Sequence, residues 1–208
     1  MKLGVVTNAG SLEGEVAMRA AGACAVEPVL LSQPSDSFEG MAAVVVVSDL
    51  SDARALVLGA AERGLPILGL GAGFGALCSL GLLDGGLVEN DPAGFIGCAQ
   101  RVAVASKDSV WTCGFFEGEQ LSLALRSRAA RFVADPDVLE RLEKDRQVIL
   151  RHVDDPTGSA NGIAGITNAK GTIVGLSLHP QYNVHDGFSG IDGRRFISSL
   201  KLFLNSRS

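Results

Sequence analysis

The chain has 208 residues, a net charge of −5 and an isoelectric point of about 5.2. This mildly acidic balance argues against a nucleic acid as partner, because phosphate binding needs a basic face. Apolar residues make up 47% of the chain and charged residues 20%, which is typical of a globular protein and excludes a disordered or fibrous one. No apolar run reaches the roughly 18 to 20 residues that span a bilayer, so we expect no membrane partner.

The cysteines and the N-terminus indicate a cellular compartment. Four cysteines, at positions 24, 78, 98 and 113, show no Cys-x-x-Cys spacing, which favours reduced thiols in a cytoplasmic protein. The N-terminal run Met1–Val6 is predicted to be a first strand and not a signal peptide. We expect one domain over residues 1–208, without a linker or an internal repeat.

The first 80 residues alternate between strand and helix patterns. Ser11 is a suitable N-cap for a helix that runs to about Ala21, and a second helix is predicted over residues 52–63. Four consecutive valines suit a central strand of a parallel sheet. The predicted strands cover residues 3–7, 26–31, 42–47 and 67–70. The alternation predicts a doubly wound, mostly parallel sheet with helices on both faces.

The pattern changes after residue 95. Residues 100–105 and 110–113 flank a polar tetrapeptide and are predicted to form a hairpin. Asp135-Pro136 starts a short helix with Leu139 and Leu142 on its inner side. The remaining predicted elements are strands over residues 148–153, 162–167 and 172–178 and an amphipathic helix over residues 193–205. We therefore expect an α/β fold of three layers, with a flavodoxin-like sheet and a small antiparallel extension.

One stretch organises the site. The apolar strand Ile67–Leu70 is followed by glycines at 71, 73 and 75 and then by a helical segment. A sharp turn from strand to helix is where α/β proteins place a nucleophile or a phosphate. The residue at the sharp point is predicted to be Gly71, which has no side chain and cannot attack a substrate.

Several segments in order resemble the class I glutamine amidotransferases. Ile67–Leu87 resembles their nucleophile elbow, and Ala160–Gln181 resembles their C-terminal His-Pro-Glu region. Within that class the chain most resembles the glutaminase subunit of phosphoribosylformylglycinamidine synthase, a purine-pathway enzyme. Asp155–Ser159 is similar to that subunit's Asn-Pro-Asn-Gly-Ser, and Gln147–Asp154 to its Gln-Val-x-x-Arg-Tyr-Val-Asp strand.

The resemblance implies a triad of cysteine, histidine and glutamate that hydrolyses glutamine. The positions that match it here are Gly71, His179 and Gln181, which we predict to be catalytically inert. Ser48-Asp49-Leu50 stands in place of the family's oxyanion loop, and Arg126–Ala130 in place of its Ala-His-Gly-Glu segment. The expected protein is thus a degenerate glutaminase-type subunit that keeps the scaffold without the chemistry.

The resemblance also implies a partner, namely the synthetase subunit of the same synthase, on which this chain would dock without catalysis. No cofactor and no metal are expected, and a homo-oligomer is left open. The alternative is a small-molecule-binding protein or an enzyme that reuses the elbow, Gly71–Gly75, for an anionic ligand. A third interpretation takes the chain as a synthase subunit by homology alone.

Other patterns allow competing interpretations of single residues. Residues 71–76 match the dinucleotide fingerprint Gly-x-Gly-x-x-Ala, but no clear acidic partner follows, so close helix–strand packing is favoured. Cys78 lies about two helical turns past Gly71, too far to replace a nucleophile there. The other three cysteines have no candidate base beside them, which favours packing.

The remaining candidates are histidines, arginines and a loop. We interpret His179 as a vestige, although a metal site with His152 and His185 is a weaker alternative. Arg126 with Arg128, and Arg194 with Arg195, are solvated surface or contacts for a partner. Residues 157–162 are a plain loop or an anion site made of backbone amides.

Overall fold

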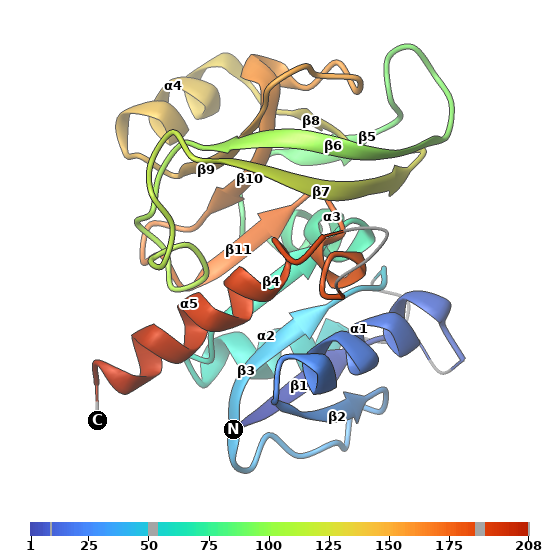
Figure 1. Cartoon of the computed structure of the whole chain (residues 1–208), viewed down its shortest axis with the longest axis vertical. Coiled ribbons are helices and arrows are strands. Elements are labelled where there is room, and N and C mark those ends of the chain that lie inside the picture. The colour runs from blue at the N-terminus through green and yellow to red at the C-terminus, as the bar shows by residue number, and fades with distance from the viewer. Residues whose placement is uncertain (9, 50–53, 186–189, 208) are drawn as a thin grey trace.

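The computed structural model describes residues 1–8, 10–49, 54–185 and 190–207. One large sheet runs through the molecule, with helices on both of its faces (Figure 1). The strands of this sheet are β1 (Lys2–Val6), β2 (Glu27–Leu31), β3 (Met41–Val46), β4 (Ile67–Leu70), β6 (Ile96–Val104), β7 (Gln120–Ser127), β9 (Val148–His152), β10 (Ile163–Thr167) and β11 (Ile173–Leu176). A separate two-stranded sheet pairs β5 (Gly86–Val88) with β8 (Arg131–Val133).

The strand order of the large sheet is β2-β1-β3-β4-β11-β10-β9-β6-β7. Strands β2, β1, β3, β4 and β11 pair in parallel, whereas β10, β9, β6 and β7 extend the sheet with antiparallel pairs. This arrangement confirms the predicted α/β class and the flavodoxin-like parallel sheet with an antiparallel extension. It also brings the carboxyl ends of β1, β3, β4 and β11 to one edge.

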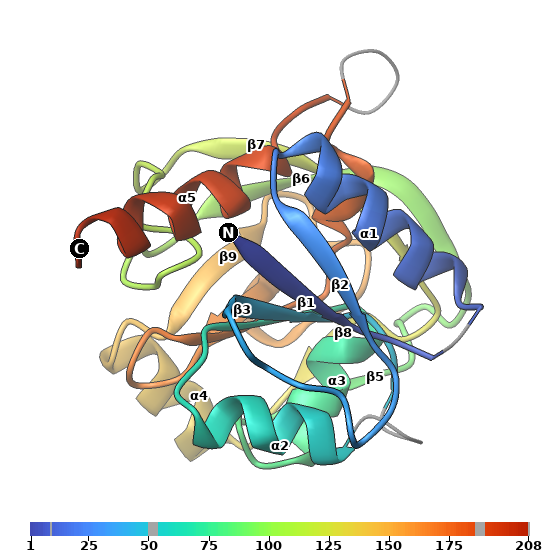
Figure 2. The ribbon, with the colours of Figure 1, turned by 90° about the horizontal axis from the view of Figure 1, so that it is seen from below.

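Helices cover the two faces of the sheet and bury one apolar cluster on each (Figure 2). On one face α1 (Leu12–Ala23) and α5 (Arg194–Asn205) pack on side chains such as Val45 and Leu68. On the other face lie α2 (Arg54–Glu62), α3 (Ala72–Ser79) and α4 (Pro136–Lys144), which contribute side chains to the cluster that contains Val44 and Val46. Alternate residues of one strand thus enter opposite clusters, as the period of a strand requires.

Local sequence explains several element boundaries. Ser11 caps α1, because its hydroxyl accepts a hydrogen bond from Gly14 N at 3.4 Å. Pro136 takes the first position of α4 after Asp135, and Leu142 is buried there, as predicted. The expected start of α2 at residue 52 lies outside the described residues. None of the described helices is long and apolar enough to cross a bilayer.

The predicted hairpin of residues 100–105 and 110–113 is wrong. Strand β6 pairs instead with β7, with Cys98 opposite Leu125 and Val102 opposite Leu121. Residues 110–113 form a turn in which Val110 and Trp111 are buried in the core cluster, and Val110 N donates to Gly171 O at 2.8 Å. The apolar run therefore fills the core rather than forming a strand of the sheet.

Candidate active site

The predicted elbow lies between β4 and α3. Gly71 has φ 53° and ψ −113°, a conformation in which an L side chain is strained. Its N–H donates to Leu176 O at 2.8 Å, which ties the turn to β11, and its carbonyl accepts from Phe74 N at 3.0 Å. A sharp backbone turn thus stands at the carboxyl end of the sheet, where an α/β site is expected.

Close packing of α3 on β3 fixes the direction in which the helix leaves the turn. A Cβ added to Gly73 would lie 1.9 Å from the carbonyl oxygen of Val46, so only glycine fits there. A Cβ added to Gly75, two residues further along α3, would have no heavy atom nearer than Leu87 Cβ at 4.0 Å. The two glycines therefore differ: Gly73 is required by packing and Gly75 is not.

His179 follows β11 and lies directly against the elbow. Its N–H donates to Ala124 O at 2.8 Å, which fixes the backbone beside β7. A Cβ added to Gly71 would lie 2.5 Å from His179 Nε2, closer than any ordinary contact. The imidazole ring therefore occupies the space into which a side chain at position 71 would extend.

The environment of His179 favours a neutral ring. Burial lowers its pKa below the ordinary value, and the guanidinium of Arg126 acts in the same direction. The carboxylate of Glu13 and the backbone contact with Ala124 act in the opposite direction. Nδ1 is buried and finds no hydrogen-bond partner among the described residues. A neutral imidazole of this kind can accept a proton, but Gly71 gives it no thiol to deprotonate.

Gln181 is held by a residue far away in the sequence. Its Nε2 donates to Glu13 Oε2 at 2.9 Å, and Tyr182 Oη donates to Glu13 Oε1 at 2.8 Å. Burial and the nearby Glu13 raise the pKa of Tyr182 to about 12. In the sequence, Glu13 is marked only as an acidic residue in the first turn of α1. No local signal could reveal a contact between residues 168 positions apart.

A hollow of about 410 Å³ adjoins the elbow. Small residues dominate its lining, which includes Gly71, Ala72, Gly75 and Ala76 together with Asp49. Cys78 also lines it, at the far end of α3, where its thiol donates to Asp84 O at 3.6 Å. Burial and the nearby Asp84 raise the pKa of Cys78 to about 12, so its thiol is protonated at neutral pH.

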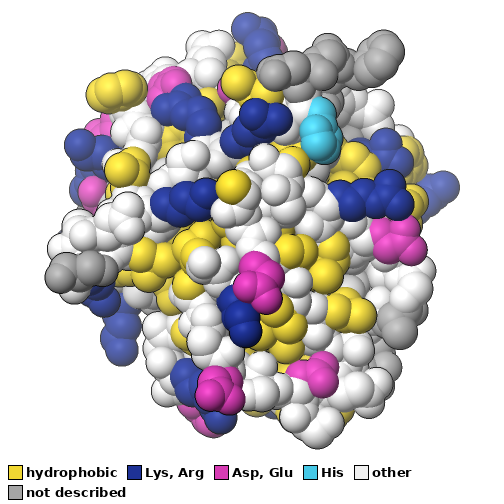
Figure 3. All heavy atoms as spheres, turned by 60° about the horizontal axis from the view of Figure 1, so that its bottom comes forward, with side chains coloured by type: hydrophobic (Ala, Val, Ile, Leu, Met, Phe, Trp, Pro, Cys, Tyr) yellow, Lys and Arg dark blue, Asp and Glu magenta, His cyan; other side chains and the backbone are white. Residues whose placement is uncertain are grey.

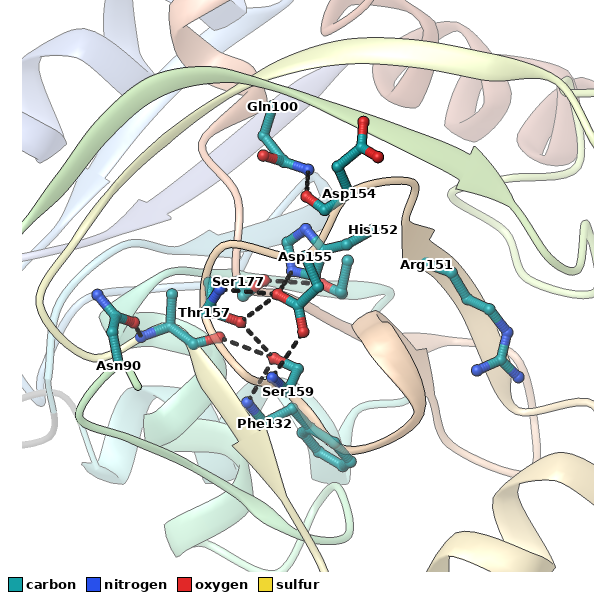
Figure 4. Close-up of polar contacts among 12 residues, drawn as sticks. Asn90, Gln100, Phe132, Arg151, His152, Asp154, Asp155, Thr157, Ser159 and Ser177 are labelled. Atoms are coloured by element: carbon teal, nitrogen blue, oxygen red, sulfur yellow. Dashed lines mark hydrogen bonds and ion pairs between the residues drawn. The ribbon is translucent and has the colours of Figure 1, made fainter. Parts of the chain in front are cut away.

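His152 ends β9 and lies beside another region, the loop Asp155–Ser159, with its Nε2 3.9 Å from Asp155 Oδ1 (Figure 4). The Asp155 carboxylate accepts from Thr157 N at 2.8 Å, from Thr157 Oγ1 at 2.7 Å and from Ser159 N at 2.7 Å. Ser159 Oγ accepts in turn from Phe132 N at 2.9 Å. Two of the amides considered for an external anion, those of Thr157 and Ser159, therefore bind a carboxylate of the same loop.

The other candidate residues are placed as follows. Within the described ranges, no three His, Cys, Asp or Glu side chains are close enough to hold a metal ion. Arg195 pairs with Glu119 and lies 4.3 Å over the ring of Phe115, and Arg194 Nε donates to Val184 O. Arg126 lies over the ring of Tyr182 at 4.9 Å. Cys98 is exposed, burial raises the pKa of Cys24, and the thiol of Cys113 donates to Ser199 O at 3.3 Å.

Comparison with known proteins identifies the family. Residues 22–207 match the CobB/CobQ-like glutamine amidotransferase domain. The chain belongs to this family. It is 39% identical to the phosphoribosylformylglycinamidine synthase subunit PurQ of Frankia casuarinae, across all of this chain and 96% of the relative. Identity to the PurQ subunit of Leifsonia xyli is 35%, across 96% of this chain and 97% of the relative.

A solved structure aligns with nearly the whole of this chain. The structure of PurLQS from Thermotoga maritima superposes with a TM-score of 0.86 at 27% identity, covering 98% of each chain. The predicted resemblance to the PurQ type of glutamine amidotransferase is thus confirmed. In this amidotransferase domain the structure brings Gly71, His179 and Gln181 to one edge of the sheet, and it adds Glu13 and Tyr182 to them.

Proposed function

We propose that this chain is a degenerate glutaminase-type subunit related to phosphoribosylformylglycinamidine synthase of purine biosynthesis. It forms a single domain over residues 1–208, does not hydrolyse glutamine, and docks on a synthetase subunit. The observation that carries this proposal is the elbow, where position 71 has no side chain and the imidazole of His179 lies 2.5 Å from where a Cβ would be. A thiol has no room there without movement of His179.

The expected loss of activity is large. Removing the nucleophile of a catalytic triad costs about 10⁶-fold in turnover, and removing an oxyanion donor about 10² to 10³-fold. Gln181 stands where the family has a glutamate, two residues after the histidine. The side-chain amide of Gln181 donates a hydrogen bond to Glu13. These losses are not additive, but the first alone leaves almost no glutaminase.

Docking is supported by the comparisons with known proteins. The Thermotoga maritima structure is described as PurLQS, and the PurQ relatives are named as subunits of a synthase. Figure 3 shows a face on which apolar side chains are interspersed with basic and acidic ones, a mixture found on protein surfaces and on interfaces alike. We expect a synthetase subunit of the same cell to be the partner.

Ammonia release from glutamine tests the proposal, measured for the chain alone and with a synthetase subunit. We expect no release above background, and none from Gly71→Cys, because the new side chain would meet His179 and because the family's oxyanion loop and the acid at position 181 are still absent. An intact PurQ subunit serves as the positive control. Turnover by the unmodified chain that His179→Ala abolishes would show that the proposal is wrong.

The hollow beside the elbow supports a second candidate, the binding of a small anionic ligand at Gly71–Gly75. Its volume of about 410 Å³ suits a small metabolite, and the start of α3 provides backbone N–H groups. The carboxylate of Asp49 in the lining opposes an anion. A thermal-shift screen with nucleotides and carboxylates decides: a shift of several degrees favours ligand binding, and silence with co-purification of a synthetase favours docking.

A further inference from the structure

Glu13 contacts the site, although it lies in the first turn of α1, 168 positions before Gln181 in the sequence. Both of its carboxylate oxygens accept hydrogen bonds, one from Gln181 Nε2 at 2.9 Å and one from Tyr182 Oη at 2.8 Å. Gln181 is buried, with 6% of its surface exposed. A charged acceptor that binds two side chains of one short segment holds that segment more firmly than neutral partners would.

The pair of Glu13 and Gln181 is chemically matched. A carboxylate only accepts hydrogen bonds, so its partner at 2.9 Å must donate, and the amide of Gln181 does. A glutamate at position 181 would place two carboxylates within hydrogen-bond distance, and one of them would have to take up a proton. Glutamine at position 181 and glutamate at position 13 therefore depend on each other.

The same carboxylate acts on His179. The ring of Tyr182 lies edge-on to the imidazole, with centroids 6.4 Å apart and planes at 63°. The charged and titratable groups around His179 come from three elements: Glu13 from α1, Arg126 from β7 and Tyr182 from the short 3₁₀ turn Pro180–Tyr182. Glu13 is the negative charge in this set, and it favours a protonated imidazole against burial and against Arg126.

We propose that Glu13 is a positioning residue that supplies, from α1, the negative charge that the family places at position 181, and that it holds Gln181 and Tyr182 beside His179. This rests on the proposed function in one respect, the match of Gln181 to the family's acid. It adds that the acid has moved rather than disappeared. The elbow then lacks its nucleophile and its oxyanion loop, and Glu13 acts on His179 through its charge and through the two side chains it holds, without a hydrogen bond to the ring.

A double-mutant cycle tests the matched pair. Glu13→Gln and Gln181→Glu are each expected to lower the thermal midpoint, Gln181→Glu by about 2 to 8 °C, since it faces Glu13 with a like charge. The combined Glu13→Gln/Gln181→Glu variant exchanges acceptor and donor and should recover most of the loss. Additive losses in the double variant would overturn the proposal.

The titration of His179, followed by NMR on histidine-labelled protein, tests the positioning role. Glu13→Gln keeps an acceptor for both partners but removes the charge, so the midpoint of His179 should move to lower pH. Replacing one histidine at a time assigns the signals. Glu15→Gln, on the exposed side of the same helix, is the matched control and should leave the midpoint in place. An unmoved midpoint in Glu13→Gln would overturn the positioning role even if the cycle shows coupling.

The outcomes of these two experiments do not depend on the proposed function. The stability cycle and the NMR midpoint need neither glutamine nor a synthetase, so ammonia release would refute the docking proposal and leave the Glu13 assignment intact. Conversely, a chain that releases no ammonia and shows an unmoved His179 midpoint would keep the docking proposal and lose this one.

Discussion

The elbow around Gly71 and the loop Asp155–Ser159 keep their shapes by different means. The elbow depends on backbone packing, because Gly73 lies against the Val46 carbonyl and Gly71 adopts a positive φ. The loop depends on side chains, since Asp155 accepts three hydrogen bonds from within it (Figure 4). Backbone packing therefore holds the shape of the elbow with no side chain at position 71, so a side chain can be lost there without loss of the fold. The loop has no such freedom, because its polar side chains form its structure.

The largest effect is expected from Gly73→Ala, which tests whether the elbow depends on backbone packing. The new Cβ would lie 1.9 Å from Val46 O and 2.5 Å from Val46 C, so backbone on both sides must shift. We expect unfolding to become easier by about 3 kcal/mol or more, measured by urea denaturation. Gly75→Ala is the matched control, because its Cβ meets nothing nearer than 4.0 Å and helix propensity improves by about 0.5 to 1 kcal/mol. Equal stability of the two variants would contradict the packing argument.

The loop is tested by Asp155→Ala, with the next largest expected effect. It removes the acceptor of three hydrogen bonds, two of them from the buried Thr157, which keeps only the contact of its hydroxyl with Ser159 Oγ at 2.7 Å; the loss should cost about 2 to 4 kcal/mol. The neighbouring control is Asp154→Ala, whose side chain is 76% exposed and pairs with an exposed Arg101. That change should cost less than about 1 kcal/mol. Similar losses in the same denaturation assay would mean that the loop does not depend on its own side chains.

Much of the fold could be predicted from hydrophobic periodicity and from the residues that cap helices and form turns. The four parallel strands before residue 71, the caps at Ser11 and Pro136 and the final helix have strong local signals. The prediction missed β7, although Leu121, Leu123 and Leu125 alternate with exposed residues as a strand requires. It chose residues 110–113 as the partner of β6 because an apolar run next to a turn looks like a strand. Pairing is decided by tertiary packing, which buries Trp111 in the core instead.

The site was predictable only where one motif or a resemblance marked it. The elbow glycines and the segment from His179 to Gln181 are each marked by a local motif, and parallel strands bring their carboxyl ends to one edge. Glu13 has no such mark. Its contact with Gln181 depends on how α1 packs against the segment after β11, and nothing within a window of the sequence encodes that distance.

The smallest expected effect is the pH dependence of stability that the two buried histidines, His152 and His179, cause. Burial lowers the pKa of both His152 and His179, so each takes up a proton more readily in the unfolded chain than in the folded one. Stability is therefore complete above the unfolded value of about 6.5 and falls as the pH drops below it, before the carboxylates titrate. His152→Gln and His179→Gln should each reduce this slope, measured as thermal midpoint between pH 7.5 and 5. Each ring has a carboxylate that acts against burial, Asp155 for His152 and Glu13 for His179, so the slope that each variant loses reports how far burial outweighs that carboxylate. An unchanged slope in both variants would contradict the assignment of two neutral buried rings.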